Sequence, residues 1–375
     1  MLIVRELLKF FSFLSNIIIS FFIHNKGKRC KGTIVIVRTD GIGDILIWLS
    51  EVERIKERYK NKKLVLITNE SIVSLIKNIN LFNEVIGIDI NKFNRKLIYK
   101  YQILKKLKKN KYEILINPIY SRSIASEGIA LNINADWKIT NSGDLSNINK
   151  IEQKISNFYY DEIINTTQKD KSEFFYNNLF TNLLIGKNQK IKLFKLKIFN
   201  EKVKSKSESY CVFFLGSSEI RKCWEIEKFL KVAEKIKIPI ILCGGKNEEK
   251  IGKEFFKNSL NKNIINKIGK TSLYETAKII EEAKFILSTD TFAVHLAAIL
   301  GTKSIVILGG GHFERFLPYP KELENENNEF LPEVIYKKME CFNCNWRCKY
   351  DDIPWRCIKN IQEKDITKLN LFYIE

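Results

Sequence analysis

Two aspartates and two glycines follow an apolar run near the start of the chain. Residues 33–48 read TIVIVRTDGIGDILIW, so Asp40, Gly41, Gly43 and Asp44 separate a β-branched run from a helical pattern. Phosphate-binding turns usually combine glycine with positive charge, and a carboxylate there indicates another chemistry. The plainer alternative is that Asp44 only caps the helix that follows.

A second polar turn lies in STDTFAVHLAAILG, residues 288–301. We expect Asp290 to be the N-cap of a helix and Gly301 its C-terminal stop. The free N–H groups and the dipole at such a helix start attract an anion, and the Thr291 hydroxyl adds a donor there. A role as a cap only and a role as a ligand are both open for Asp290. His295 lies on an apolar face, so we expect it to pack behind the site.

Two further turns carry charge after apolar runs. In GSSEIRKCW, Ser217 and Lys222 follow a strand-like run, and a cation in such a loop can pair with a diphosphate. In CGGKNEE, Glu248 follows Gly244 and Gly245 and can accept hydrogen bonds from ribose hydroxyls. The alternatives are a solvated charge pair for Lys222 and first-turn dipole stabilisation for Glu248.

Four of the eight cysteines cluster near the C-terminus. Their spacings are two, three and eight intervening residues, at Cys341, Cys344, Cys348 and Cys357. Four thiolates at such spacings can bind zinc in a structural site, and reduced thiols or a disulfide are the alternatives. The scattered cysteines elsewhere indicate a reducing compartment.

An alternation of strand and helix patterns must position these residues. Strands are expected at residues 33–38, 63–68, 84–89 and 112–118, with helices at 45–59, 71–78, 94–108 and 171–184. The rhythm restarts with strands at residues 210–215, 239–243, 264–267, 285–288 and 304–308, and helices at 225–236, 248–258, 273–283 and 291–300. This pattern predicts two doubly wound α/β domains, with ligands in a cleft at the carboxyl ends of the strands. Residues 136–170 are polar and are left unassigned.

The N-terminal segment is apolar and aromatic and is followed by basic residues. Residues 7–23 read LLKFFSFLSNIIISFFI, and Lys26, Lys28, Arg29 and Lys31 come next. A secretory signal would place its positive charge first. We expect an interfacial helix on an anionic membrane surface. A helix packed on the protein and a single membrane span are the alternatives.

Composition limits the class of partner. The chain has 375 residues and a net charge of +20, which favours acidic partners such as anionic lipid or phosphorylated substrates. Lysines are spread along the chain without an arginine-rich block, so nucleic acid is not expected as a partner. The length predicts two domains, and a hydrophobic content of 45% is enough for large cores.

In their order along the chain, VRTDGIGD, GSSEIRKCW, CGGKNEE and STDTFAVHLAAILG resemble the motifs of glycosyltransferase family 9, the heptosyltransferase-like enzymes. The resemblance covers residues 33–361 and is strongest at residues 290–298. It implies the GT-B fold of two Rossmann-like domains and transfer of a sugar from a nucleotide diphosphate with inversion. It also implies that catalysis needs no metal or other cofactor.

The resemblance gives the aspartates and the donor-site residues their roles. It implies that Asp44 is the general base, with Asp40 in reserve, in a turn formed by Gly41 and Gly43. Binding of the donor diphosphate is expected from six residues: Ser217, Lys222, Asp290, Thr291, Phe292 and Ala293. Glu248, or Glu249 if the register shifts, would hold the ribose, with His295 behind the site.

The implied organisation has five parts. They are a membrane-associating segment (1–31), an acceptor-side domain (32–186), a linker (187–209), a nucleotide-sugar-binding domain (210–345) and a cysteine-containing tail (346–375). The implied donor is a nucleotide diphosphate sugar, with a heptose or a similar sugar and ADP as the expected nucleotide. The implied acceptor is a lipid-linked saccharide of the lipopolysaccharide core or a related glycan. The expected location is peripheral, on the cytoplasmic face of the inner membrane.

The sequence departs from the family pattern at Ile47, Ser50 and Phe292, so the resemblance does not fix the sugar or the acceptor. A non-catalytic protein of the same fold that binds sugar or lipid is the main alternative. A nucleotide-dependent oxidoreductase is weaker, because Leu46 stands where the dinucleotide fingerprint needs its third glycine.

Overall fold

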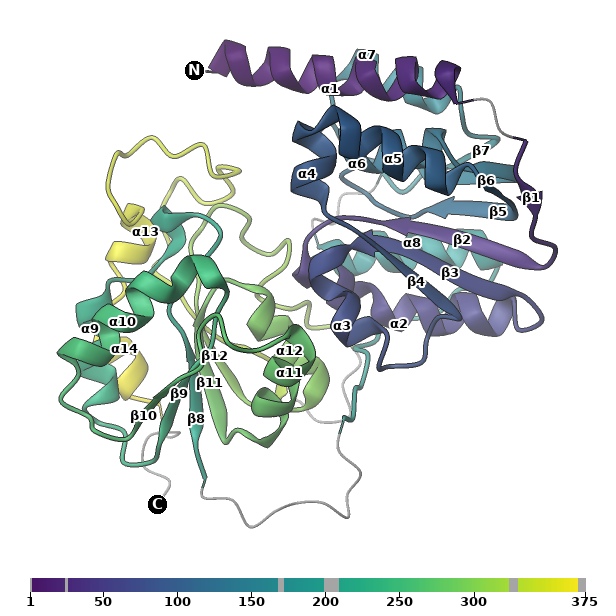
Figure 1. The fold of residues 1–375 in the computed structure, drawn as a ribbon. Coiled ribbons are helices and arrows are strands. Elements are labelled where there is room, and N and C mark those ends of the chain that lie inside the picture. The colour runs from purple at the N-terminus through teal and green to yellow at the C-terminus, as the bar shows by residue number, and fades with distance from the viewer. Residues whose placement is uncertain (1, 24–25, 168–171, 199–208, 324–329, 370–375) are drawn as a thin grey trace. The chain divides into compact units, whose positions relative to one another are not determined.

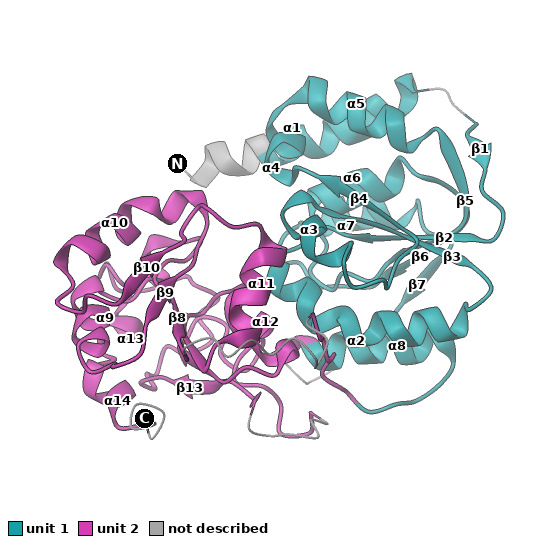
Figure 2. Cartoon of the chain, turned by 60° about the horizontal axis from the view of Figure 1, so that its bottom comes forward, with its two compact units in different colours: residues 1–170, 174–190 teal, residues 171–173, 191–375 magenta. Residues whose placement is uncertain are grey.

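The computed structural model divides the chain into two compact units, which Figure 2 colours separately. Unit 1 is Met1–Asp170 with Phe174–Lys190, and unit 2 is Lys171–Glu173 with Ile191–Glu375. The structure describes residues 2–23, 26–167, 172–198, 209–323 and 330–369, and for residues 2–8 it describes the backbone only. The linker expected at residues 187–209 lies partly outside these ranges.

Unit 1 is built on a parallel sheet whose strands run in the order β4-β3-β2-β5-β6-β7, with β1 pairing β5. Its strands are β1 (Lys28–Arg29), β2 (Thr33–Arg38), β3 (Lys63–Asn69), β4 (Glu84–Ile88), β5 (Asn110–Asn117), β6 (Asn134–Asn141) and β7 (Glu162–Ile164). All six residues of β2 are buried, which explains its unbroken run of β-branched side chains.

Helices cover both faces of this sheet (Figure 1). One face carries α2 (Ile42–Arg58), α3 (Val73–Ile76) and α8 (Glu173–Ile185), and the other carries α4 (Ile90–Arg95), α5 (Leu97–Leu107), α6 (Ile124–Leu131) and α7 (Lys150–Asn157). The N-terminal helix α1 (Leu2–Phe22) packs over α5 and α6. None of the helices in the described ranges is long and apolar enough to cross a membrane.

Unit 2 repeats this plan in the order β10-β9-β8-β11-β12-β13, all parallel. Its strands are β8 (Cys211–Phe214), β9 (Ile240–Leu242), β10 (Ile264–Asn266), β11 (Phe285–Thr289), β12 (Ser304–Ile307) and β13 (Glu333–Ile335). Its helices are α9 (Ile226–Ala233), α10 (Glu249–Asn258), α11 (Leu273–Glu282), α12 (Phe292–Leu300), α13 (Arg356–Lys359) and α14 (Glu363–Thr367). The last two pack with α9 into the main core of this unit, through Trp355, Ile358 and Ile366.

The predicted class, two Rossmann-like α/β domains, is confirmed. Every strand expected from the sequence is present to within two residues at each end, and α2, α9, α10, α11 and α12 lie where helices were expected. The helix expected at residues 94–108 is α5, preceded by the short helix α4. The one expected at 71–78 begins as a 3-10 turn (Glu70–Ile72) and continues as α3. The unassigned residues 136–170 contain most of β6 and all of α7 and β7.

Both sheets share a topology that positions ligands. Numbered in chain order, and with the two-residue β1 left out, the strands of each sheet are arranged 3-2-1-4-5-6, so the direction of winding reverses between the first and fourth strands. That reversal lies between β2 and β5 in unit 1 and between β8 and β11 in unit 2. Open α/β sheets bind ligands outside the carboxyl ends of the strands at this point.

Candidate functional site

In unit 1, the turn after β2 lies at the reversal point of the sheet. The strand ends at Arg38 and α2 begins at Ile42 with Gly41 as its N-cap residue, so Asp44 is the third residue inside the helix. It is the acidic residue of the first helical turn, and the N-cap position belongs to Gly41. The alternative that Asp44 is an N-cap is therefore wrong.

Gly41 makes room for the Asp44 carboxylate. A Cβ at position 41 would lie 2.7 Å from an Asp44 carboxylate oxygen. The backbone at Gly41 has φ −67° and ψ 159°, which any residue can adopt. Gly41 is thus needed for space and not for a strained turn, and Gly43 belongs to the first turn of α2. The chain passes from β2 to α2 through the expected turn, without a backbone conformation at Gly41 that only glycine adopts.

The buried Arg38 side chain contacts this turn at Asp40 and Asp44. Its guanidinium is fully buried and makes two contacts to the Asp40 carboxylate, Nε to Oδ1 at 3.2 Å and Nη2 to Oδ2 at 3.1 Å. It also donates to the Asn177 side chain at 2.9 Å and to the Asp44 carbonyl at 3.3 Å. Asp40 is thus committed to neutralising a buried cation, whereas Arg38 reaches Asp44 through its backbone.

This geometry separates the two aspartates. Both side chains are partly exposed, and Asp40 forms a two-point ion pair with the buried Arg38. If Asp40 took up a proton during a reaction, the buried positive charge of Arg38 would lose its negative partner. Asp44, at the positive end of α2, is the better candidate to accept a proton.

A buried polar network follows the other strand at the reversal point, β5. Asn117 at its end donates to Glu127 at 3.0 Å and to the Tyr160 hydroxyl oxygen at 2.9 Å. Arg122 pairs with Glu127 at 3.4 Å, while burial raises the pKa of that carboxyl. The network fixes the loop after β5 and was not found from the sequence, because its members lie in unrelated motifs.

In unit 2, a side-chain hydrogen bond links β8 and β11 just beyond the last residues that pair in the sheet. Thr289, the last residue of β11, donates its hydroxyl to the Gly216 carbonyl after β8 at 2.8 Å. The two sequence motifs GSSEIRK and STDT are thus brought to one place, as the strand order requires.

The helix after β11 begins one residue later than expected. Thr291 is the N-cap of α12, and its hydroxyl accepts a 3.4 Å hydrogen bond from the Ala293 N–H and lies 3.0 Å from the Ser288 hydroxyl. The expectation that Asp290 is the N-cap is therefore wrong. Gly301 ends the helix with φ +76°, as expected. The amides of Phe292 and Ala293 form the first turn of the helix.

Lys222 lies beside Asp290 and under an aromatic ring. Its Nζ is 4.0 Å from an Asp290 carboxylate oxygen and 4.1 Å from the centre of the Trp346 ring. Burial raises the pKa of Asp290, and the neighbouring Lys222 opposes that shift. Asp290 and Trp346 together hold the ammonium group near the start of α12. Trp346 was not assigned to the donor site from the sequence.

Glu248 lies over the ends of β8 and β9. Its carboxylate accepts a hydrogen bond from the Gly245 N–H at 2.9 Å and covers the backbone of Gly216 and Gly244 so closely that a Cβ at either glycine would collide with it. Burial raises the pKa of Glu248. Glu249 instead is exposed, pairs with Lys253 at 4.0 Å and lies against Gly269.

His295 is buried one turn into α12. Its Nδ1 lies 2.9 Å from the Tyr319 hydroxyl, and the two rings stack with centroids 5.7 Å apart. Burial lowers the pKa of His295 to about 4, so the ring is neutral at physiological pH. The buried His295 ring thus packs α12, the helix whose N-cap is Thr291, against Tyr319.

The cysteine-containing tail packs against the turn after β12. Gly309, Gly310 and Gly311 leave room for the rings of Phe342 and Trp346. One pocket there is lined by the four clustered cysteines together with Trp346 and Trp355. All four cysteines are free thiols, and burial raises the pKa of Cys344 and Cys357. Within the described residues, no group of three or more His, Cys, Asp or Glu side chains is arranged to hold a metal ion. Of the alternatives for Cys341, Cys344, Cys348 and Cys357, the structure has the free thiols.

Comparisons with known proteins agree on one family. The family described as glycosyltransferase family 9 (heptosyltransferase) matches residues 101–346. A solved family 9 glycosyl transferase from Veillonella parvula is 13% identical, with a TM-score of 0.69 over 91% of this chain and 97% of that one. No sequence among the curated proteins matches this chain.

Two solved heptosyltransferases from E. coli are also similar in fold. Heptosyltransferase WaaC, solved with ADP-2-deoxy-2-fluoro heptose, is 17% identical, with a TM-score of 0.64 over 84% of this chain and 97% of that one. ADP-heptose lps heptosyltransferase II is 15% identical, with a TM-score of 0.62 over 91% of this chain and 98% of that one. The matches therefore extend over nearly the whole length of both E. coli proteins.

Proposed function

The chain belongs to glycosyltransferase family 9, and we propose that this glycosyltransferase moves a heptose or a similar sugar from a nucleotide diphosphate sugar to an acceptor hydroxyl, with inversion and without a catalytic metal. Unit 2 binds the donor, and Asp44 of unit 1 activates the acceptor. The observation that carries the proposal is the matched placement of Asp44 and Lys222 just after β2 and β8, the strands at the reversal points of their two sheets.

The reaction needs one base and one stabiliser of negative charge. The Asp44 carboxylate accepts the proton of the acceptor hydroxyl as its oxygen attacks the anomeric carbon. The bond between that carbon and the phosphate oxygen breaks, and its electron pair leaves with the nucleoside diphosphate. Attack from the face opposite the leaving group inverts the anomeric centre.

The donor diphosphate meets positive charge that the protein itself supplies. The Lys222 ammonium, the Thr291 hydroxyl and the amides of Phe292 and Ala293 stabilise the charge that grows on the leaving group. Ser217 adds a hydroxyl from the turn after β8. The Asp290 carboxylate would repel a diphosphate, and its 4.0 Å contact to Lys222 suits it to orient that cation instead.

Glu248 is the better candidate for the ribose. Its carboxylate already lies over the ends of β8 and β9, at the sheet edge where a nucleotide binds in this topology, while Glu249 is directed to Lys253 and Gly269. An ADP-linked sugar is the proposed donor, because the similar E. coli enzymes are named or solved with ADP-heptose compounds. The proposed acceptor is a lipid-linked saccharide of the lipopolysaccharide core or a related surface glycan. The proposed location is the cytoplasmic face of the inner membrane, as a peripheral protein.

A panel of nucleotide sugars tests the donor. Purified protein is incubated with ADP-, UDP- and GDP-linked sugars, with and without a lipid-linked core saccharide, and the released nucleoside diphosphate is measured. We expect acceptor-dependent release of ADP from an ADP-linked heptose. Acceptor-dependent release from a different donor would correct the sugar, and release from none in the presence of several acceptors would contradict the transferase proposal.

Chelation tests the absence of a catalytic metal. Because Lys222 and the start of α12 carry the positive charge, turnover in EDTA should stay within about twofold of the untreated enzyme. A loss of turnover that added Mg²⁺ or Mn²⁺ restores, without a change in the far-ultraviolet circular dichroism spectrum, would contradict the metal-free mechanism.

A further inference from the structure

The N-terminal helix α1 has one face built into unit 1. Phe13, Asn16 and Ile23 are buried, and Asn16 donates to the Ile124 carbonyl at the start of α6 at 3.0 Å. Gly128 of α6 is the point of close approach, because a Cβ there would collide with the Asn16 side chain. The alternative of a helix packed on the protein is therefore confirmed for this face.

Two lysines of the α5 segment bind α1, one at its middle and one at its C-terminal end. Lys100 donates to the Ser12 carbonyl at 3.0 Å and to the Ser15 hydroxyl at 2.8 Å, and Lys108 donates to the Ser20 and Ile23 carbonyls at 2.7 and 3.1 Å. Lys108 thus binds carbonyls that the end of α1 leaves without helical partners. The two sets of contacts also show that α1 and α5 run parallel and side by side.

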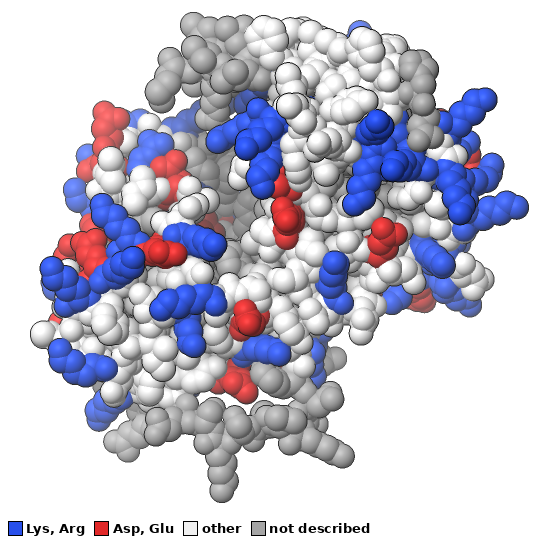
Figure 3. Space-filling model, viewed as in Figure 1, with Lys and Arg blue, Asp and Glu red and all other residues white. Residues whose placement is uncertain are grey.

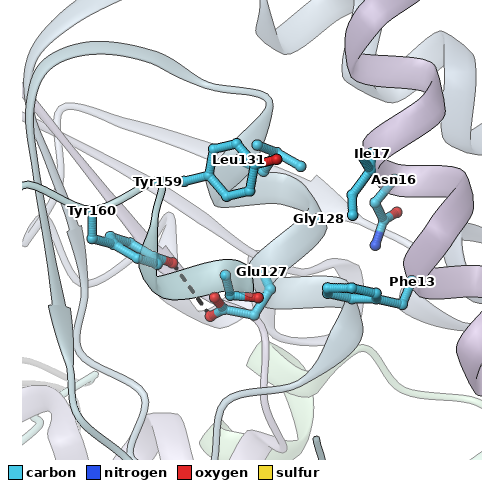
Figure 4. Close-up of a pocket in the computed structure, with 9 residues that line it drawn as sticks. Phe13, Asn16, Ile17, Glu127, Gly128, Leu131, Tyr159 and Tyr160 are labelled. Carbon is cyan, nitrogen blue, oxygen red and sulfur yellow. Dashed lines mark hydrogen bonds between the residues drawn. The ribbon is translucent and has the colours of Figure 1, made fainter. Parts of the chain in front are cut away.

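The other flank of α1 lies against α7. Phe13 and Ile17 pack with Ile148 and Ile155, and a small pocket lies between α1, α6 and the end of α7. Figure 4 shows Phe13, Asn16 and Ile17 of α1 lining this pocket, across from the hydrogen-bonded Tyr160 and Glu127. Helix α1 is therefore held by three other helices and cannot be regarded as a detachable anchor.

The opposite face of α1 is apolar and exposed. Phe11, Phe21 and Phe22 are 63%, 71% and 75% exposed, and three more large apolar residues are also exposed on it: Phe10, Leu14 and Ile18. Their spacing of three and four residues places them along one stripe of the helix. A stripe of this kind on a soluble surface marks an interaction site.

The flanking helices extend this surface. Leu97 and Ile98 are exposed at the start of α5, which the lysine contacts place beside the Phe10 end of α1. Ile151 and Phe158 are exposed on the α7 side. We call the exposed apolar residues of α1, α5 and α7 the outer face; they are Phe10, Phe11, Leu14, Ile18, Phe21, Phe22, Leu97, Ile98, Ile151 and Phe158.

Exposed lysines lie next to the outer face, on two segments that carry no acidic residue; Arg29 and Lys111 of these segments pair with Asp136 of β6. Residues 9–31 and 90–112 contain no Asp or Glu. Lys105, Lys106 and Lys109 are exposed at the end of α5, and Lys26, Lys28 and Lys31 are exposed after α1. Figure 3 shows uncharged surface where α1 lies, with Lys and Arg side chains on the elements beneath it.

We propose that the outer face binds an anionic lipid bilayer surface, with the α1 phenylalanines inserted at the headgroup boundary and the lysines of the α1 and α5 ends on acidic headgroups. Apolar side chains on one stripe of a helix and flanking lysines are the two features that such binding requires. A second copy of the chain fits less well, because pairing two outer faces would bring like charges together.

Paired substitutions at exposed positions test the surface without disturbing the fold. Deletion of residues 1–26 is unsuitable, because it would leave Lys100 and Lys108 without the groups they bind. The test variant is Phe21→Ser with Phe22→Ser. The matched control is Phe256→Ser with Leu260→Ser in unit 2, where the side chains are 56% and 72% exposed.

Sedimentation of the full chain with vesicles measures the binding. The vesicles contain phosphatidylcholine alone or phosphatidylcholine with phosphatidylglycerol. We expect wild type and the control to bind the anionic vesicles and the Phe21/Phe22 variant to bind them at least tenfold more weakly. Equal binding by the Phe21/Phe22 variant, or equal binding of wild type to neutral vesicles, would overturn the proposal.

Charge is tested with a second matched pair. Substituting Lys105, Lys106 and Lys109 by Gln should weaken binding to anionic vesicles at least tenfold, whereas the same change at Lys250, Lys253 and Lys257 of α10 should have less than a threefold effect. Light scattering without vesicles completes the test. If the Phe21/Phe22 variant converts an oligomeric protein to a monomer, the outer face is an interface between copies and the proposal fails. The measurements need no sugar donor, so they stand or fall independently of the proposed reaction.

Discussion

The turn after β2 in unit 1 and the turn after β11 in unit 2 are the same structural unit used in opposite ways. Each joins a buried parallel strand to a helix and carries an aspartate. In unit 1, Asp44 lies inside the first turn of α2 over Gly41. In unit 2, Asp290 lies before the helix and beside Lys222, which leaves the start of α12 to the Thr291 hydroxyl and the amides.

This difference shows how position within one turn selects the chemistry. A carboxylate inside the first helical turn is stabilised as an anion and suits a base. A carboxylate placed before the N-cap beside a lysine leaves the helix start available for an anion and keeps the cation in place. The two turns thus supply the proton acceptor and the diphosphate site of the proposed reaction.

The largest expected effect comes from the base. Asp44→Asn should lower kcat by about 10³-fold, the range of general base catalysis, with little change in melting temperature, because Asn matches Asp in size. Asp40→Asn should do the reverse, keeping kcat within tenfold while lowering the melting temperature, because the buried Arg38 loses its charged partner. Steady-state kinetics and thermal unfolding measure both. If Asp40→Asn abolishes turnover and Asp44→Asn does not, the two roles are exchanged.

The next effect comes from the cation. Lys222→Met should lower kcat/KM for the donor by about 10²-fold, because one charge-stabilising contact to the leaving group is lost. The control is Lys228→Met, since Lys228 lies in the same unit and contacts carbonyls near α13. Comparable losses in the two variants would show a general effect of charge and argue against a specific role for Lys222.

A smaller effect is expected from Trp346, a positioning residue that acts through Lys222. Trp346→Leu should raise the donor KM about tenfold with kcat nearly unchanged, and Trp346→Phe should restore most of the affinity because a ring face remains under the ammonium. Equal effects of Leu and Phe would mean that Trp346 serves only to pack the tail.

The smallest effect on activity is expected from His295, which instead makes stability depend on pH. Because the pKa of the buried ring is lowered from 6.5 to about 4, the unfolded chain binds its proton first as the pH falls. The contribution of His295 to the free energy of unfolding is therefore fully present above pH 6.5. It falls by up to about 3 kcal/mol as the pH approaches 4. His295→Gln should remove this part of the slope in chemical denaturation. An unchanged slope would mean that His295 is not buried as a neutral ring.

The sequence was sufficient to predict helices and strands whose apolar residues follow a regular pattern. β2 was predicted at its exact bounds because all six residues are buried and residues 34–37 form an unbroken apolar run. β6 was not, because most residues of NADWKITN are polar, and α6 was not, because it is a short helix that contains Gly128. Patterning detects burial, and these segments are stabilised by partners that are distant in sequence.

For the candidate site, the sequence indicated which motifs to consider but not which side chains contact one another. The order of the four turns located Asp44, Lys222, Glu248 and Thr291, but the N-cap of α12 was misplaced by one residue. The clamp of Arg38 on Asp40 and the ring of Trp346 over Lys222 were missed, because each depends on where the folded chain brings a side chain. The roles assigned to these residues stay predictions until they are measured.

Calorimetric titration of ADP into the Asp44→Asn variant tests the central claim most directly. If Asp44 acts only on the acceptor, the inactive variant should bind ADP within threefold of wild type, while Lys222→Met binds it at least tenfold more weakly. Loss of ADP binding in Asp44→Asn, with binding retained in Lys222→Met, would contradict the division of labour between the two turns.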